Sequence, residues 1–233
     1  MRVLHIVGFY PEIGGPYAVI KNLLLKLVEK SIDIKVLSPL PKNYDMKKIE
    51  FAKTLPFSVE YVEEQLPCFI WPSFSLKYFK KINEEAKKYD LIYLARLFDF
   101  YTIPLLLNNH KFIYGSHGTF MQEAYKMKLF KRVKKDVFLK LIGKRILEKA
   151  KFIHLITEEE KRHFLQFFPE FKDKIRVVSN GLILSKLEAN LTKEDLLKEY
   201  HDLKDKKVIL FLSRINWKKG LDLLIPAFAK LNS

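Results

Sequence analysis

Residues 208–229 read Val208-Ile-Leu-Phe-Leu-Ser-Arg-Ile-Asn-Trp-Lys-Lys-Gly-Leu-Asp-Leu-Leu-Ile-Pro-Ala-Phe-Ala229. The stretch begins with five apolar residues in a row, a pattern typical of a strand buried on both faces. A basic turn follows and ends at Gly220, after which apolar residues return at helical spacing. We therefore expect a strand, a cationic turn and a helix, with Arg214 and Lys219 placed where phosphate groups commonly bind in α/β folds.

The same alternation of apolar runs and amphipathic segments extends back to the first residues. Strands are predicted at 3–7, 32–38, 57–62, 90–95, 112–118 with its turn, 152–156, 175–181 with its turn, and 208–212. Helices are predicted at 16–28, 75–88, 98–107, 123–149, 157–168 and 185–206, and Thr157-Glu-Glu-Glu160 predicts a capping box. Alternating strands and helices predict an α/β fold with a Rossmann-like, doubly wound and mostly parallel sheet.

Composition narrows the classes of partner. Lys and Arg outnumber Asp and Glu by 42 to 27, a net charge of +15, so an anionic partner is expected: nucleic acid, an anionic membrane surface or a phosphorylated small molecule. The single cysteine, Cys68, precludes an internal disulfide. No signal peptide and no membrane-spanning stretch is recognisable, so we expect a cytoplasmic protein.

Sequence motifs exclude several chemistries. The six histidines are scattered without metal-ligand spacing, so no metal site is expected. Neither a P-loop, a Gly-x-Ser-x-Gly elbow nor a Gly-x-Gly-x-x-Gly signature is found, and a nicotinamide cofactor is therefore not expected.

Four short motifs, in order, resemble family 4 glycosyltransferases, which have the GT-B fold of two Rossmann-like domains. Ser213-Arg-Ile-Asn-Trp-Lys-Lys-Gly220 resembles the Gly-Arg-Leu-x-x-x-Lys-Gly segment that opens the second domain, with Ser213 in place of Gly. Gly14-Gly15 resembles the loop after the first strand, and Ser116-His-Gly-Thr119 resembles the Pro-His-Gly-x turn. Ile175-Arg-Val-Val-Ser-Asn-Gly181 resembles Val-Ile-Pro-Asn-Gly, with Ser179 in place of Pro.

The resemblance implies a retaining enzyme that moves a sugar from a nucleotide-sugar donor to a glycan or lipid-linked acceptor, in surface polysaccharide or glycoconjugate synthesis. The nucleotide sugar is a co-substrate and no cofactor is implied. By resemblance, Arg214 and Lys219 hold the donor diphosphate, Gly14 and Gly15 approach it from the other side of the cleft, and His117 supports the sugar as the catalytic residue.

Other positions are less closely matched. Arg96, at the end of a predicted strand, is a candidate contact for the acceptor or another anion, and a capping cation is the alternative. Relatives often carry histidines where this chain has Tyr93 and Ala95, which weakens any transfer of detail about the acceptor.

The predicted helix at 123–149 has a strongly basic side. Its expected core face carries Met127, Phe130, Val133, Val137, Leu141 and Ile146, widened by Phe138, Ile142 and Leu147. The candidate membrane-facing residues are Lys128, Lys131, Arg132, Lys134 and Lys135. An anionic membrane surface, reached from the inner face, is one interpretation, and an ordinary solvated helix face is the other. Nucleic acid is disfavoured because aromatic residues do not interleave with the charges.

The resemblance also predicts the domain organisation. Residues 1–184 would form the acceptor-side Rossmann-like domain, 185–206 a linker, and 207–233 the first strand, turn and helix of an incomplete donor-binding domain. We expect a truncated chain that is inactive alone; a fragment, or half of a split enzyme completed by a second chain, are the alternatives. A non-catalytic membrane-surface or regulatory subunit and a nucleotide-sugar epimerase also stay open. The sequence does not identify the donor nucleotide, the sugar, the acceptor or the oligomeric state.

Overall fold

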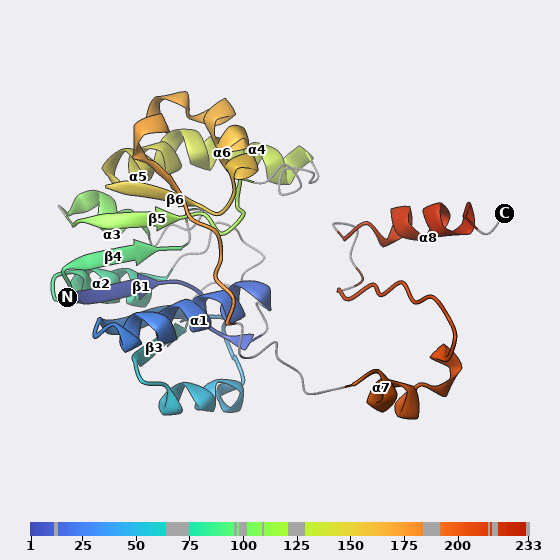
Figure 1. Ribbon diagram of the computed structural model, residues 1–233. Coiled ribbons are helices and arrows are strands. Elements are labelled where there is room, and N and C mark those ends of the chain that lie inside the picture. Colours follow the sequence, from blue (N-terminus) through green and yellow to red (C-terminus); the bar gives the residue numbers. More distant parts are fainter. Residues whose placement is uncertain are drawn as a thin grey trace. The chain divides into compact units, whose positions relative to one another are not determined.

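The computed structural model describes residues 1–11, 14–63, 75–95, 97, 102–108, 110–120, 129–183, 192–213, 215 and 219–231, without the side chains of 129–132. The chain divides into two compact units, Met1–Leu182 and Ile183–Ser233, and the domain boundary expected from the sequence was residue 184 (Figure 1).

The described part of the first unit is built on a seven-stranded, all-parallel sheet with the strand order β3-β2-β1-β4-β5-β6-β7. The strands are β1 (Arg2–Ile6), β2 (Asp33–Leu40), β3 (Ser58–Glu63), β4 (Leu91–Leu94), β5 (Phe112–Gly115), β6 (Phe152–Leu155) and β7 (Ile175–Val177). From β1 the chain adds β2 and β3 on one side and then β4 to β7 on the other, so the strand order reverses between β1 and β4. The carboxyl ends of all strands lie along one edge. Ligands of α/β folds bind at such an edge.

Helices cover both faces of the sheet (Figure 1). They are α1 (Gly15–Glu29), α2 (Leu76–Ala86), α3 (Ile103–Leu107), α4 (Leu129–Phe138), α5 (Lys144–Lys149) and α6 (Glu158–Phe167), with 3-10 helices at Met46–Thr54 and Pro169–Lys174. The core lies in two clusters: Leu4 and Ile6 of β1 pack in one cluster with α2 and α6, whereas Val7, directly after β1, packs with Ile20 and Leu24 of α1. The α/β fold expected from the sequence is confirmed.

Local differences have local causes. The Met46–Thr54 helix lies in a region predicted to be irregular because of its prolines, but no proline falls inside it and Asp45 caps it by accepting a hydrogen bond from Lys47 N. The predicted helix at 123–149 is helical from Leu129 to Lys149, and the turn at Leu139–Gly143 is π-helical. Of the predicted helix at 98–107, the described part forms only Ile103–Leu107.

The second unit contains α7 (Lys193–Glu199) and α8 (Leu221–Ala229). The cap that the sequence indicated at Thr192 is confirmed as a full capping box with Asp195. Gly220 begins α8 with a positive φ of 69°, a conformation that glycine adopts without cost. Of the helix predicted at 185–206, residues 184–191 lie outside the described part of the chain.

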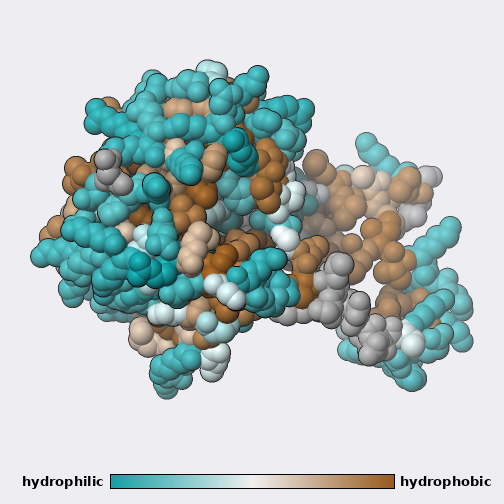
Figure 2. All heavy atoms as spheres, turned by 60° about the vertical axis from the view of Figure 1, so that its left-hand side comes forward, coloured by the Kyte–Doolittle hydropathy of each residue, from teal (hydrophilic) through white to brown (hydrophobic). Residues whose placement is uncertain are grey.

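The buried strand predicted at 208–212 does not form. These residues have no regular structure, and Val208, Leu210 and Leu212 are 57%, 77% and 88% exposed. Figure 2 shows hydrophobic residues on the surface of this unit. A parallel strand is stabilised by hydrogen bonds to neighbouring strands and by cover on its faces, and the described residues of the second unit supply neither.

Candidate functional site

His117 lies in a tight turn directly after β5, at the carboxyl edge of the sheet. Its φ is +45° and that of Gly118 is +83°, both in the left-handed region. Histidine is among the few non-glycine residues enriched there. Hydrogen bonds from Thr119 N to Ser116 O and from Ser116 N to His154 O, each 3.0 Å, fix the turn to itself and to β6.

A buried carboxylate also holds this turn. Glu160 is fully buried at the start of α6, and its Oε1 accepts hydrogen bonds from Ser116 Oγ at 2.7 Å and Phe120 N at 3.2 Å. Its Oε2 accepts from Ile156 N at 3.0 Å. Thr157 Oγ1 caps Glu160 N at 3.0 Å as predicted. The carboxylate was expected to complete a capping box on Thr157 N, and it bonds to the turn and to Ile156 N instead.

Tyr93 links His117 to a second histidine. The Tyr93 hydroxyl lies 3.3 Å from His117 Nε2 and 2.8 Å from His154 Nδ1, and His154 Nε2 lies 2.8 Å from the carbonyl oxygen of Val178. His5 stacks on the Tyr93 ring, with centroids 5.0 Å apart and planes at 26°. Four aromatic side chains from β1, β4, β6 and the turn after β5 therefore form one cluster, which we call the His–Tyr cluster (His5, Tyr93, His117 and His154).

The absence of a side chain at Gly115 permits this arrangement. A Cβ added there would lie 2.0 Å from the Tyr93 hydroxyl oxygen and 2.4 Å from Cζ. Strand register explains the meeting, because His5 is paired with Tyr93 and Gly115 with His154. From the sequence, Tyr93 was only a departure from relatives, and His5, His154 and Glu160 were not predicted as site residues. The sequence pattern that could have indicated this cluster is the recurrence of polar aromatic residues on one face of adjacent strands.

Burial keeps His5, Tyr93 and His117 uncharged near neutral pH. Burial, with a smaller contribution from the charge of His154, lowers the pKa of His117 to about 4. Burial lowers the pKa of His5 to about 3, with a contribution from His117. Burial raises the pKa of Tyr93, and the carboxylate of Glu160 adds to the shift. His117 can therefore bind a ligand through hydrogen bonds rather than through charge.

Gly14 and Gly15 lie at the amino end of α1. Gly14 is the N-cap residue with a φ of 70°, Pro16 follows in the first turn, and that turn carries no acidic residue. A Cβ at Gly14 or at Gly15 would meet nothing within 4 Å. The free backbone amides of a helix amino end attract anions. This end of α1 and the His117 turn follow strands β1 and β5 at the same edge of the sheet.

Several of the residues selected from the sequence lie outside the described part of the chain: Arg96, Lys128 and Arg214. The backbone of Lys131 and Arg132 is in α4, but their side chains are not described. Lys219 is exposed just before Gly220, in the second unit.

The face of the helix at 129–149 differs from the prediction. Lys135, expected to face a membrane, is 7% exposed and its Nζ donates to the carbonyl oxygen of Thr119 at 3.3 Å, so that expectation is wrong. Val133, Val137 and Leu141, expected in the core, are 51%, 50% and 62% exposed. The physical reason is helical spacing: at 3.6 residues per turn Ile146 lies about 180° from Val137, so a helix that buries Phe138 and Ile146 exposes Val137. The exposed stripe of Val133, Val137 and Leu141 lies beside the exposed side chains of Lys134 and Lys140.

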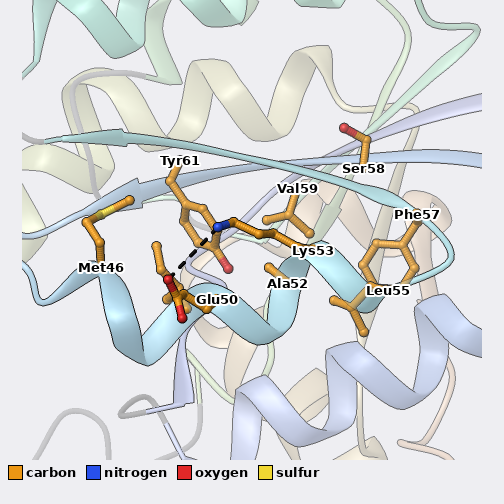
Figure 3. A pocket seen from close by; sticks show the side chains of 10 residues that line it. Met46, Glu50, Ala52, Lys53, Leu55, Phe57, Ser58, Val59 and Tyr61 are labelled. Atoms are coloured by element: carbon orange, nitrogen blue, oxygen red, sulfur yellow. Dashed lines mark ion pairs between the residues drawn. The ribbon is translucent and has the colours of Figure 1, made fainter.

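Two hollows on the first unit differ in how they relate to the His–Tyr cluster. One, of about 390 Å³, lies between the Met46–Thr54 helix and β3, and its charged groups, Glu50 and Lys53, pair with each other at 4.0 Å (Figure 3). The other, of about 340 Å³, is an apolar groove on the α1 face of the sheet, with Tyr93 and His154 among its lining residues. Among the described residues, no group of His, Cys, Asp and Glu could hold a metal ion, and no helix is long and apolar enough to cross a membrane.

Comparison with known proteins gave consistent matches. The sequence model of Glycosyltransferase Family 4 matches residues 13–186. An uncharacterized glycosyltransferase of Methanocaldococcus jannaschii is 24% identical over 244 residues, which cover 99% of this chain and 60% of the relative. The chain therefore spans less than two thirds of that relative's length.

Two solved structures share the fold. A UDP-GlcNAc 2-epimerase from Neisseria meningitidis, bound to UDP-GlcNAc, superposes with a TM-score of 0.53 at 16% identity, over 89% of this chain and 56% of that one. A UDP-glucosyltransferase from Polygonum tinctorium superposes with a TM-score of 0.53 at 12% identity, over 84% of this chain and 55% of that one.

Proposed function

The chain belongs to glycosyltransferase family 4, and from this premise we propose that it takes part in transferring a sugar from a nucleotide-sugar donor to a glycan or lipid-linked acceptor. Surface polysaccharide or glycoconjugate synthesis is the setting we propose, with retention of configuration at the transferred sugar carbon. In this proposal the first unit contributes the acceptor side of the cleft, and the second unit begins the donor side.

The observation that supports this proposal best is the His117 turn. It is held by the buried carboxylate of Glu160 and by the His–Tyr cluster, at the edge of the sheet where the amino end of α1 also lies. A half-buried, uncharged imidazole at the same sheet edge as a helix amino end with open space at two glycines suits a ligand that has both hydroxyl groups and an anionic part. A nucleotide sugar has both.

The proposed mechanism is electrostatic. The amides of Gly14 and Gly15 approach the donor diphosphate, and the positive end of the α1 dipole stabilises the charge that develops as the diphosphate leaves. Arg214 and Lys219 supply full positive charges to the same group. His117 contacts the sugar and orients it for transfer. Arg96 is our candidate contact for the acceptor, and none of these roles requires a metal ion.

The proposal concerns the complete transferase, and the chain spans 60% of its relative. We propose that residues 1–233 alone transfer little sugar, and that the rest of the donor domain comes from further sequence or from a second chain. The direct test is therefore donor binding, measured by calorimetry with UDP-, GDP- and ADP-glucose on the wild type and on Lys219→Ala and Arg214→Ala.

We expect millimolar binding of at least one donor and about a tenfold loss in each variant, since a charge-assisted contact to phosphate contributes on the order of 1.5 kcal/mol. Lys207→Ala, another exposed lysine of the second unit, is the matched control. Equal affinity in all four proteins would contradict the assignment of Arg214 and Lys219. Release of a C2-epimerised nucleotide sugar would instead indicate an epimerase.

The exposed stripe of Val133, Val137 and Leu141 favours a second role. Apolar side chains beside Lys134 and Lys140 suit contact with an anionic lipid surface, where the lysines meet headgroups and the stripe enters the interface. A peripheral protein on the inner membrane face would then meet a lipid-linked acceptor directly. The alternative to an active transferase, a non-catalytic membrane-surface subunit, rests on the same stripe.

A further inference from the structure

The hydrogen bonds of the His–Tyr cluster have a direction that follows from which groups can donate. The carbonyl oxygen of Val178 only accepts, so His154 Nε2, 2.8 Å away, carries a hydrogen. In neutral His154 the other ring nitrogen, Nδ1, then has a lone pair. That nitrogen lies 2.8 Å from the Tyr93 hydroxyl, which must therefore donate its hydrogen to His154.

The position of the hydrogen on His117 follows from the role of Tyr93. Since the hydroxyl hydrogen of Tyr93 is used by His154, the Tyr93 oxygen faces His117 Nε2, 3.3 Å away, only as an acceptor. His117 Nε2 thus carries a hydrogen. Burial lowers the pKa of His117 to about 4, so at neutral pH the ring has one hydrogen and Nδ1 keeps a lone pair. Among the described residues, Nδ1 of His117 has no hydrogen-bond partner.

We propose that Tyr93 and His154 are positioning residues which lock His117 in the Nε2–H tautomer, so that His117 Nδ1 accepts a hydrogen bond from a hydroxyl group of the ligand. The chain of donors starts at His117 and ends at the Val178 carbonyl. The stack of His5 on Tyr93 and the missing side chain at Gly115 hold Tyr93 where both histidines reach it.

The lock determines which ligand groups His117 can bind. An acceptor nitrogen pairs with a hydroxyl or an amide N–H, and it repels a carboxylate or a phosphate, which offer lone pairs only. Naming that hydroxyl as one of the donor sugar rests on the proposed function. The tautomer itself does not depend on the proposed function, so the two can be tested separately.

The tautomer can be observed directly in the full chain. Long-range proton–nitrogen correlation spectra of ¹⁵N-histidine-labelled protein at pH 8 distinguish the two neutral tautomers, and His117→Gln and His154→Gln assign the signals. We expect Nε2–H for both rings in the wild type. In Tyr93→Phe we expect His117 to become a mixture of tautomers, while His154 stays Nε2–H because Val178 still holds it.

Tyr78→Phe is the matched control, since it also deletes a buried tyrosine hydroxyl, one that donates to Leu37 O at 2.7 Å outside the cluster. Its His117 signals should match the wild type. A wild-type His117 in the Nδ1–H form, or an unchanged His117 tautomer in Tyr93→Phe, overturns the proposal.

A binding measurement tests the sugar contact. We expect Tyr93→Phe to weaken the donor found by the calorimetric panel three- to tenfold and to leave the affinity for its free nucleoside diphosphate unchanged. An equal loss for both ligands overturns the sugar contact. If no donor of the panel binds the wild type or shifts its His117 signals, the proposed function fails, and the spectra still decide the tautomer lock.

Discussion

Glu160 and Ser116 are joined by a hydrogen bond of 2.7 Å between two buried side chains, 44 residues apart in the sequence. The bond ties the amino end of α6 to the turn that carries His117. Because Glu160 also accepts from two backbone amides, a single carboxylate satisfies three donors that would otherwise be buried without partners.

Glu160→Gln should therefore lower the free energy of unfolding and displace the turn that carries His117. A glutamine side chain replaces one acceptor oxygen with an NH₂ group, which would face a donor. We expect a loss of about 2 kcal/mol in the free energy of unfolding, the usual cost of a buried polar group left unpaired. Urea unfolding measures this loss, and weaker donor binding should accompany it. Glu159→Gln, an exposed neighbour in the same helical turn, should change neither quantity.

Gly115→Ala should expel Tyr93 from its place in the cluster. The new Cβ would overlap the hydroxyl and ring carbons of Tyr93, so one of the two must move. Overpacking of this kind typically costs about 1–3 kcal/mol. In a double-mutant cycle with Tyr93→Ala, the cost of Gly115→Ala should largely disappear, because the clashing ring is gone. Additive losses in the cycle would show that Gly115 is needed for another reason.

Gly15→Ala should separate ligand binding from stability. Gly15 has an ordinary helical φ, and a methyl group added there would meet only open space, so alanine should be neutral or slightly stabilising in the first turn of α1. If a diphosphate approaches the backbone here, the methyl group would obstruct it and raise the dissociation constant about tenfold, or about 1.4 kcal/mol. Gly181→Ala, also in open space, is the control. Unchanged donor affinity in Gly15→Ala would argue against this contact.

The alternation of strands and helices was predictable because burial imposes a local period on each element. Buried strands read as apolar runs, and α1 and α2 carry apolar residues at helical spacing. The strand at 208–212 shows the limit of that argument. Its apolar run predicts a strand only where neighbouring strands and covering helices are available, and those are long-range properties that the run does not contain.

The site was only partly predictable for a related reason. His117 was selected through a motif, whereas Tyr93, His154 and Glu160 reach it from distant positions through sheet register and a long-range hydrogen bond. A carboxylate three residues after Thr157 fits a local capping box equally well, so nothing local distinguishes the two partners. The outward stripe was missed because the expected face combined Val137 with Ile146, which lie about 180° apart at 3.6 residues per turn, and only one of the two can face the core.

The exposed stripe of Val133, Val137 and Leu141 predicts a lipid interaction that charge alone does not explain. In flotation assays with anionic vesicles, Val137→Glu should reduce binding more than Lys134→Gln. The first change puts a charge at the centre of the apolar stripe, and the second removes about 1 kcal/mol of attraction to anionic headgroups. Val178→Glu, at a valine of similar exposure outside the stripe, controls for the added negative charge. Equal binding by the wild type and Val137→Glu would leave the helix face as an ordinary solvated surface.

The lowered pKa values of His5 and His117 should make the first unit less stable as the pH falls. The pKa of His5 is about 3 and that of His117 about 4 in the folded chain, against about 6.5 when unfolded, so the unfolded state binds more protons in acid. Their contribution to stability is complete above pH 6.5 and is lost as the pH falls towards 4 and 3. At pH 5, His5 alone accounts for a loss of about 2 kcal/mol relative to pH 8.

His5→Phe keeps a ring against Tyr93 and removes the titrating group. His117, whose charge also acts on His5, and the hydrogen bond between Tyr93 and His154 remain. Urea unfolding at pH 8, 7, 6 and 5 should therefore show a shallower decline for His5→Phe than for the wild type. His201→Phe, the same change at an exposed position of the second unit, should follow the wild-type slope. Glu85 does not affect the comparison between pH 5 and 8. Burial would raise the pKa of Glu85, but Lys35 and Lys88 outweigh burial and lower that pKa to about 2. The contribution of Glu85 to stability is therefore lost only below pH 4.5. Parallel curves for the wild type and His5→Phe would mean that His5 is protonated in the folded chain, and the uncharged cluster would have to be abandoned.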